Sequence, residues 1–361
     1  MTHAARTTGP AMCASFRPAV VAAGIVALAA ISGCTAAPNQ PAQRPQRIPA
    51  SPSPTVPENA TISTPAFQRG IDVDAYTAPK QDFSAAAAAV VAYAKSLHAN
   101  ALSISFPFFM TNSRSTAVFA TPRTPTPAQL AVLIADAESA GLYVSIRPLL
   151  SEFQIGGNRT TWQPVNMSAW FASYTQFLLP YARMAQASKV GMFIVGAEFT
   201  RFGDSPLWNG LDQALAKVFH GRLAYSDNGS AQMSRSDGGL RTFKTVDAYP
   251  PINPPFLAGW QAYDRALPTG TILTELGIAA WEGAWRAPWE HRPRNHVFDP
   301  QVQVMWFSAA CQAAKATGLG GIYFWTLGLQ VTFKTTTAAT PGAWAHSAGA
   351  TAIARCFEDA Q

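Results

Sequence analysis

The sequence predicts an α/β fold in which eight parallel strands, alternating with helices, close into a (β/α)8 TIM barrel. The first observation behind this prediction is an apolar run, rich in β-branched residues, within residues 189–200, which ends at Glu198. The second is a repeat of the pattern in residues 271–277, which ends at Glu275 and a glycine. Runs of this composition are typical of strands buried on both faces. A carboxylate at the end of such a strand lies at the rim on which α/β barrels carry their chemistry.

The third observation is that the same alternation continues through the chain after residue 67. Short apolar or β-branched runs predict eight strands, at 69–74, 101–106, 142–147, 190–195, 222–226, 245–249, 271–275 and 320–325. Apolar residues at helical spacing predict helices over 82–97, 126–140, 168–188, 206–219, 256–267, 300–317 and 341–357. This order favours a closed barrel over an open, doubly wound sheet.

Several residues mark the ends and irregularities of these helices. Asp82 precedes the first helix as an N-cap residue, and Thr126, followed by proline, opens the second. Pro180 is expected to interrupt or bend the long third helix. The loop at 149–166 is longer than a connection needs, so we expect it to shape a site.

The first 33 residues are predicted to be a lipoprotein signal peptide. Two arginines precede an apolar run at 19–31, which is too short for a comfortable transmembrane helix. The run ends in the tetrad ISGC, which resembles a bacterial lipobox and implies cleavage before Cys34 and lipidation of its thiol. The alternative is an ordinary signal peptide that is cleaved a few residues later.

Residues 34–66 are predicted to be a disordered tether. They are rich in Pro, Ala, Ser and Thr and hold almost no large apolar side chains, so they cannot bury enough surface to offset the entropy of ordering. Residues 67–361 remain for one catalytic barrel domain. We therefore expect an exported protein that a lipid on Cys34 anchors to the outer face of the bacterial cell membrane or within the cell envelope.

Charge and cysteine content narrow the possible partners and cofactors. The net charge is +6, but the basic residues are scattered, which argues against a nucleic-acid partner; we expect a monomer. Cys311 and Cys356 are left once the signal and the lipidated thiol are set aside, and in an exported protein they either pair or stay free. No cysteine pair or histidine motif suggests a metal, and no glycine-rich turn follows the first strand, so no cofactor is expected.

Acidic and aromatic side chains collect at the predicted strand ends. The candidates are Asp72, Asp74, Phe108, Arg147, Glu198, Asp227, Asn228, Asp247, Tyr249, Glu275 and Trp325. Cleavage of a glycosidic bond needs one carboxylic acid to protonate the leaving oxygen and one carboxylate at the anomeric carbon. Tryptophan is a natural platform for the apolar face of a sugar. This ring therefore predicts a carbohydrate substrate, with Glu198 and Glu275 as the catalytic pair.

Several members of this ring have a structural alternative. Arg147 either binds a sugar or forms an ion pair with Glu152 or Asp72. Asp72 and Asp247 are candidates for hydrogen-bonded rim residues. Trp281 and two later tryptophans recur every four residues, the spacing of one helical face, so they form either a packed lid or outer sugar-stacking subsites.

Four segments together resemble the glycoside hydrolases of clan A, and family 113 most of all. They are FIVGAEF, VDAYPP, ILTELG and GGIYFWTL, and the resemblance spans most of residues 68–329. It implies that Glu198 is the general acid/base and Glu275 the nucleophile of a retaining mechanism. It also implies that Tyr249 hydrogen-bonds the nucleophile and that Trp325 forms the floor under the reacting sugar.

One position departs from the pattern of the clan. Many members carry asparagine before the acid/base glutamate, where this chain has Ala197, so contact with the sugar 2-hydroxyl must come from elsewhere. We expect a secreted, lipid-anchored retaining glycoside hydrolase that cleaves a β-linked polysaccharide or cell-envelope glycan. The alternatives are a non-catalytic glycan-binding surface lipoprotein and a transglycosylase that uses the same residues. The sugar, the linkage and endo or exo action stay open.

Overall fold

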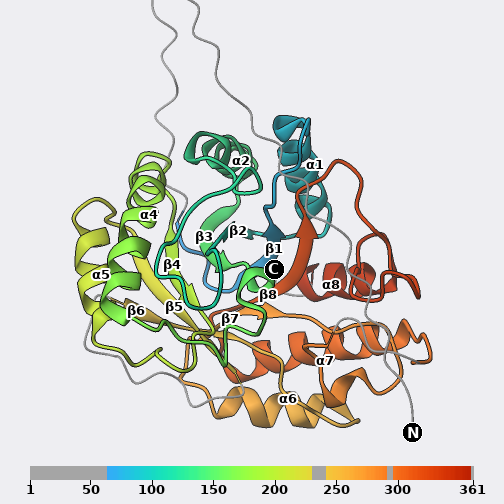
Figure 1. Ribbon diagram of the computed structural model, residues 1–361. Helices are drawn as coiled ribbons and strands as arrows, with labels where there is room; N and C mark the ends of the chain where they lie inside the picture. Colours follow the sequence, from blue (N-terminus) through green and yellow to red (C-terminus); the bar gives the residue numbers. More distant parts are fainter. Residues whose placement is uncertain (1–62, 230–240, 291–295, 359–361) are drawn as a thin grey trace, which may run out of the picture. The chain divides into compact units, whose positions relative to one another are not determined.

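The structure is a computed structural model that describes residues 63–229, 241–290 and 296–358. In this part of the chain eight parallel strands form a closed barrel in sequential order, with β8 beside β1 (Figure 1). The predicted (β/α)8 TIM barrel is thereby confirmed. The predicted signal peptide, Cys34 and the tether up to residue 62 lie outside the described residues.

The predicted strands and helices correspond closely to the observed ones. The strands are β1 Gln68–Asp74, β2 Ala101–Phe108, β3 Tyr143–Leu150, β4 Met192–Ala197, β5 Arg222–Asn228, β6 Arg241–Asp247, β7 Ile272–Leu276 and β8 Gly321–Gly328. The helices are α1 Phe83–Ser96, α2 Pro127–Ser139, α3 Glu152–Ile155, α4 Met167–Ala187, α5 Leu207–Ala216, α6 Phe256–Arg265, the 3-10 turn η1 Ala284–Arg286, α7 Gln301–Thr317 and α8 Ala348–Glu358.

The helix starts follow the capping chemistry that the sequence indicates. The Asp82 side chain accepts a hydrogen bond from the backbone N–H of Ala85 at the start of α1. Thr126 and Gln129 form a reciprocal capping box at the start of α2, with proline in the first turn. These contacts satisfy N–H groups that a helix start otherwise leaves unpaired.

Of the two effects predicted for Pro180, an interruption does not occur, because helix α4 continues through this residue. One helix boundary was predicted wrongly. The last helix begins at Ala348 and not at residue 341, because the preceding residues form a turn-rich loop that is fastened to α7. The side-chain amide of Gln303 on α7 donates to the carbonyls of Pro341 and Ala343 in that loop, at 3.1 and 3.2 Å.

Side chains fill the interior of the barrel. A cluster from six of the strands lies there: Ala101, Tyr143, Met192, Ile194, Ala224, Ile272 and Tyr323. One tyrosine ring lies over a glycine on a neighbouring strand, and the other over the glycine that directly precedes one. A Cβ at Gly70 would be 2.1 Å from the Tyr323 ring, and one at Gly191 would be 2.1 Å from the Tyr143 ring. Large residues thus fit opposite glycines, which gives the strand ends a rigid base.

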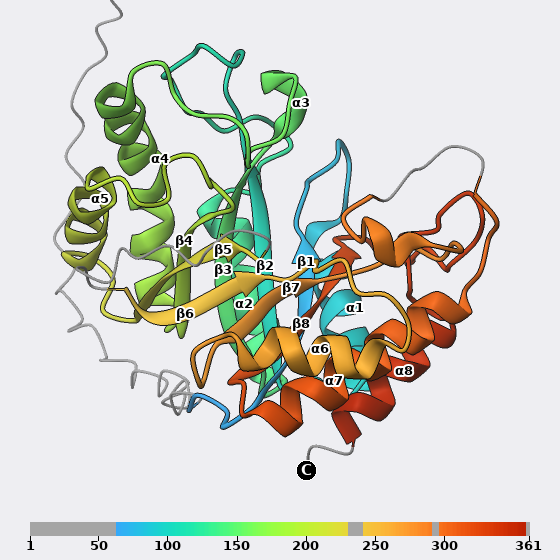
Figure 2. The same cartoon turned by 90° about the horizontal axis from the view of Figure 1, so that it is seen from below.

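Helices α6, α7 and α8 pack in sequence along one side of the barrel (Figures 1 and 2). A disulfide joins Cys311 on α7 to Cys356 on α8, with 5.9 Å between the Cα atoms. The pairing that the sequence left open is therefore present. Among the described helices, none is both long and apolar enough to cross a membrane.

Candidate active site

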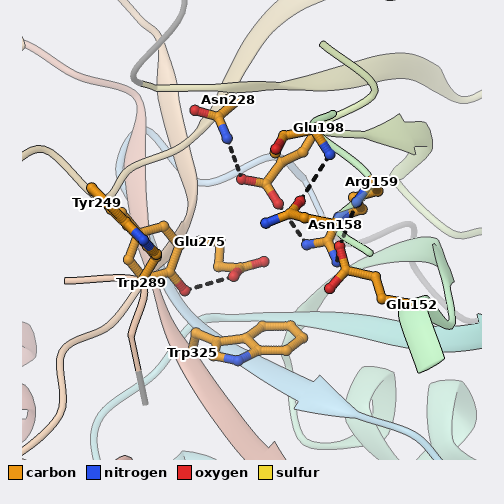
Figure 3. A pocket seen from close by; sticks show the side chains of 10 residues that line it. Glu152, Asn158, Arg159, Glu198, Asn228, Tyr249, Glu275, Trp289 and Trp325 are labelled. Carbon is orange, nitrogen blue, oxygen red and sulfur yellow. Dashed lines mark hydrogen bonds and ion pairs between the residues drawn. The ribbon is translucent and has the colours of Figure 1, made fainter. Parts of the chain in front are cut away.

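A pocket of about 440 Å³ opens at the carboxyl ends of the strands (Figure 3). It is lined by Glu152, Asn158, Arg159, Thr160, Glu198, Asn228, Tyr249, Glu275, Trp289 and Trp325. The strands β4, β5, β7 and β8 supply residues at or next to their ends, and the loop after β3 supplies the first four. Both predicted catalytic glutamates and three predicted substrate-binding residues therefore meet in one cavity.

Glu275 belongs to β7, and both of its carboxylate oxygens are held. Its Oε1 accepts a hydrogen bond from the Tyr249 hydroxyl at 2.6 Å, and its Oε2 accepts one from Nη2 of Arg147 at 2.7 Å. The residue is only 5% exposed. Tyr249 is thus placed as the hydrogen-bond partner that the family resemblance implied. The carboxylate is fixed in orientation and faces the pocket (Figure 3).

Arg147 lies completely buried beneath the pocket and links several acids. Its Nη1 donates to Oδ1 of Asp247 at 2.8 Å, and its Nε donates to Oγ of Ser105 at 3.1 Å. Asp72 is also fully buried, and its Oδ1 lies 3.9 Å from Nη2. Of the two ion pairs considered for Arg147, the one with Asp72 is present as this longer contact. Arg147 bonds Glu275 and not Glu152, so it supports the nucleophile candidate from below. Because Arg147 is fully buried and does not line the pocket, its prediction as a substrate-binding residue is corrected.

Asp247 completes this buried network. Its Oδ1 also accepts hydrogen bonds from Ser226 Oγ at 2.6 Å and from Thr274 Oγ1 at 3.0 Å. Burial raises the pKa of Asp247 to about 6, although the Arg147 guanidinium opposes this rise. Burial likewise raises the pKa of Asp72 well above its ordinary value. The network therefore concentrates carboxyl groups around one cation.

Glu198 follows β4 directly and has a left-handed backbone conformation, with φ of +57°. A non-glycine residue rarely adopts this conformation, and such residues cluster at functional sites. Its Oε1 accepts from Nδ2 of Asn228 at 2.9 Å, and its Oε2 accepts from Nη2 of Arg159 at 2.6 Å. Burial raises the pKa of Glu198 to about 7; Arg159 opposes the rise, whereas the charges of Asp247 and Glu275 add to it.

Arg159 and Glu152 are site residues that the sequence did not single out for such roles. Both come from the long loop after β3, where Glu152 begins the short helix α3 (Figure 2). Oε1 of Glu152 accepts from the backbone N–H of Arg159 at 2.7 Å and lies 3.5 Å from its Nη1. The signal in the sequence was the unusual length of this loop, which indicated a site without identifying its residues.

Trp325 and Asn228 lie where they were expected. Trp325 is on β8 and lines the pocket, and the Arg147 guanidinium carbon is 5.3 Å from the centroid of its ring. Asn228 ends β5 and lines the same cavity. Each can therefore contact a ligand in the pocket.

Phe108, Asp72 and Trp281 require correction, because none of them lines this pocket. Phe108 is fully buried and packs against Tyr174 of α4, with ring centroids 4.9 Å apart. Asp72 is fully buried in the network below the pocket. Trp281 is 5% exposed and stacks on His296, with ring centroids 5.6 Å apart. We therefore do not include these three in the set of residues that contact substrate.

The three regularly spaced tryptophans do not share a helical face. Only a 3-10 turn, η1, forms in this segment, so the spacing of four has no structural basis there. Trp285 packs on Phe256, with ring centroids 5.7 Å apart. Trp289, which is 49% exposed, lines the pocket. Among these tryptophans it is therefore the candidate for sugar stacking.

Two further cavities continue from the pocket over the ends of β8 and β1. The first, of about 440 Å³, shares Trp325 with the pocket. The second, of about 820 Å³, shares Asp74, Gly328, Gln330 and Lys334 with the first. The three cavities are therefore neighbours at this end of the barrel. Within the described residues, no group of three or more His, Cys, Asp or Glu side chains is arranged to hold a metal ion.

The chain resembles known glycoside hydrolases in sequence pattern and in structure. The model of Glycoside Hydrolase Family 113 matches residues 75–344. A GH113 β-1,4-mannanase complex has a TM-score of 0.69 at 16% identity, covering 81% of this chain and 99% of its own. The GH113 β-mannanase AaManA of Alicyclobacillus acidocaldarius, in complex with ManMIm, also has a TM-score of 0.69, at 18% identity. The match covers 84% of this chain and 100% of that protein.

A more distant solved structure has the same fold. A family 5 mannosidase from Rhizomucor miehei has a TM-score of 0.55 at 11% identity, covering 82% of this chain and 94% of its own. No curated protein sequence matches the chain. At these identities the structural likeness establishes the barrel, and the family model, which covers most of the described residues, establishes the relationship. The chain belongs to glycoside hydrolase family 113 and is a glycoside hydrolase of clan A.

Proposed function

We propose that this protein cleaves a β-linked glycan with retention of configuration, with Glu275 as the nucleophile and Glu198 as the general acid/base. The observation that carries the proposal is the meeting of these two carboxyl groups, from the ends of β7 and β4, in one pocket (Figure 3). Their surroundings differ as the two roles require. Glu275 is held by two donors on the barrel side, whereas burial raises the pKa of Glu198 to about 7.

The reaction proceeds in two displacements. In the first, an oxygen of Glu275 attacks the anomeric carbon while the Glu198 proton passes to the glycosidic oxygen, and the aglycone leaves as an alcohol. In the second, Glu198 takes a proton from water, whose oxygen attacks the anomeric carbon and releases Glu275. Trp325 lies under the reacting sugar, and Tyr249 steadies Glu275 in both steps.

The proposed substrate is a β-linked polysaccharide or a cell-envelope glycan. Mannan-type glycans come first among the candidates, because the similar solved structures are those of mannanases and a mannosidase. The neighbouring cavities over β8 and β1 are candidate places for sugar units beyond the cleaved bond. With Ala197 in place of the usual asparagine, the side-chain amides of Asn158 and Asn228, which line the pocket, are candidates for polar contact with sugar hydroxyls.

We further propose that the protein is exported and held by a lipid on Cys34 at the outer face of the bacterial cell membrane, or within the cell envelope. The support is the sequence alone: a short apolar run, the ISGC tetrad and a proline-rich stretch before the barrel. Such a tether would let a barrel at the membrane reach an extended glycan.

The experiment that tests the catalytic proposal combines a substrate screen with chemical rescue. Purified protein is assayed on β-mannan, β-glucan and bacterial cell-wall glycans, and anomeric configuration is followed by proton NMR. Glu198→Ala and Glu275→Ala should each reduce turnover by at least about a thousandfold, in the range that loss of one acid, base or nucleophile produces. Glu282→Ala, which alters an exposed glutamate outside the pocket, should leave activity unchanged.

Azide rescue then separates the two roles. With an activated aryl β-glycoside, Glu198→Ala should give the β-glycosyl azide, because Glu275 still forms the covalent intermediate. Glu275→Ala should give the α-glycosyl azide, because azide replaces the nucleophile directly. Full activity in either variant would refute the assignment. Binding of glycans without turnover would indicate the non-catalytic alternative, and sugar transfer to added acceptors would indicate a transglycosylase.

A further inference from the structure

Arg159 lies between two carboxyl groups of the pocket (Figure 3). Its Nη2 donates to Oε2 of Glu198 at 2.6 Å, and its Nη1 lies 3.5 Å from Oε1 of Glu152. The side chain is 14% exposed, so this charge is largely removed from water. A buried cation with one close and one more distant carboxyl partner can change partners by a small movement.

The observed contacts suit the ionised form of Glu198. Both of its oxygens face donors, with Asn228 at Oε1 and Arg159 at Oε2. A guanidinium has only donors, so it cannot accept a hydrogen bond from a protonated carboxyl oxygen. A general acid/base has to alternate between carboxylic acid and carboxylate, so the contact with Arg159 must weaken whenever Glu198 carries the proton.

Glu152 is placed to receive the guanidinium when that happens. Its carboxylate already accepts the backbone N–H of Arg159 at 2.7 Å, which keeps the two residues together. The Glu152 side chain is 36% exposed, and water can solvate its charge when the guanidinium turns away. The cation therefore keeps a carboxylate partner in either position, and no unpaired charge is left buried.

We propose that Arg159 is a positioning residue that pairs with Glu198 when Glu198 is a carboxylate and moves to Glu152 when Glu198 is protonated. This inference rests on the acid/base role proposed for Glu198. In the first displacement Arg159 would lie on Glu152, which leaves Glu198 free to donate its proton. In the second it would return to Glu198 and stabilise the carboxylate from which the proton was lost.

Other charged groups face Glu198 from the surrounding elements. Asp247 at the end of β6 and Glu275 on β7 both disfavour its ionisation, whereas Arg147 on β3 favours it but is already bonded to those two acids. Asn228 and Tyr249 are neutral neighbours. Arg159 is therefore the cation in direct contact with Glu198, and its removal should leave the effect of the two acids largely uncompensated.

The first test measures the ionisation of Glu198 directly and needs no substrate. Full-length protein is labelled with ¹³C at the glutamate carboxyl carbons, and the Glu198 resonance is identified by its absence in Glu198→Gln. Arg159→Ala should raise the midpoint of this titration by about one pH unit or more. Glu152→Gln should lower it, because Arg159 then has Glu198 as its one ionised partner in this pair.

Two further variants serve as controls. Arg159→Lys should recover part of the shift, because it restores the charge without the planar fork. Arg201→Ala, in which an exposed arginine near the end of β4 is removed, should leave the midpoint in place. The proposal is overturned if Arg159→Ala leaves the Glu198 midpoint unmoved, or if Glu152→Gln shifts it in the same direction as Arg159→Ala.

Kinetics supply a second, separate readout. With 2,4-dinitrophenyl β-mannobioside, whose leaving group needs no acid, Arg159→Ala should lower kcat at pH 7 about fivefold and change kcat/KM much less, because the higher midpoint leaves less Glu198 in the carboxylate form that the second displacement needs as a base. On a glycoside with a poor leaving group, the alkaline limb of the pH profile of kcat/KM should shift to higher pH. Absence of turnover and of azide rescue would refute the proposed function, whereas a rise of the Glu198 midpoint in Arg159→Ala together with a fall in Glu152→Gln would still show that this pair controls the ionisation of Glu198.

Discussion

Replacing Arg147 with methionine tests whether the buried network below the pocket stabilises the barrel. Methionine keeps much of the volume of the side chain but removes every donor. The change would leave Asp247 without its 2.8 Å contact and Glu275 without its 2.7 Å contact, and Asp72 would lose its nearest cation. All three acids are at most 5% exposed, so water cannot readily replace the guanidinium.

The expected magnitude follows from the burial of these groups. Removal of one partner from a buried ion pair typically costs about 3–5 kcal/mol, because an uncompensated charge remains inside. For a domain of roughly 300 residues the entropy of unfolding is about 0.6 kcal/mol/K, so this loss corresponds to a fall in Tm of about 5–8 °C. Two acids lose close contacts here, so the upper half of that range is expected.

The loss of stability in Arg147→Met should depend on pH in one direction. Arg147 opposes the rise in pKa that burial causes in Asp72 and Asp247, and the pKa of Asp247 stands at about 6 with Arg147 in place. Without the guanidinium both pKa values should rise further. A raised folded-state pKa means that the folded protein binds more protons than the unfolded chain, so stability falls as pH rises. The fall in Tm should therefore be larger at pH 8 than at pH 5.

Differential scanning calorimetry of both proteins at the two pH values measures this effect. Arg183→Met, at an exposed position on α4, is the control for the loss of a surface arginine and should change Tm by less than about 1 °C. Asp247→Asn in the Arg147→Met background should recover part of the loss, since it removes one unpaired charge. A decrease in Tm of less than about 2 °C, or an equal decrease at both pH values, would refute the reasoning.

Two further predictions concern the barrel interior and the membrane anchor. A Cβ at Gly70 would lie 2.1 Å from the Tyr323 ring, so Gly70→Ala should lower the free energy of unfolding, measured in urea, by about 1–3 kcal/mol. The control is Gly210→Ala on α5, where a Cβ meets nothing within 4 Å; it should leave the free energy of unfolding unchanged or raise it by up to about 1 kcal/mol. Equal effects of the two substitutions would contradict this prediction. Cys34→Ala should release the protein from the membrane fraction and abolish incorporation of labelled palmitate, and persistent labelling would exclude this anchor.

The elements that reasoning from the sequence identified well are those with a local signal. The apolar runs before Glu198 and before Glu275 have the composition of buried strands, and both form buried strands in the structure. The start of α2 follows from Thr126, because the cap bonds only residues next to it in the chain. Helix α4 continues through Pro180, because packing of its long apolar face outweighs the loss of one backbone hydrogen bond.

The candidate site was predicted in part. Glu198, Glu275, Tyr249 and Trp325 could be found because each stands at the end of a recognisable strand. Arg159 could not, because it comes from a loop whose path depends on contacts far along the chain, and nothing in its neighbours distinguishes it from a solvated surface arginine. The length of the loop indicated a site, but only its folded path brings Arg159 to Glu198.

The sequence by itself determined the order of strands and helices and the placing of two glutamates at strand ends, because apolar runs and helix caps are local properties. Only the tertiary structure decided which way each strand residue faces. A strand buried on both sides is apolar throughout, so it lacks the alternation that would distinguish inward from outward positions. Phe108 accordingly points outward onto α4, whereas Arg147 on the neighbouring strand points inward to the two acids beneath the pocket.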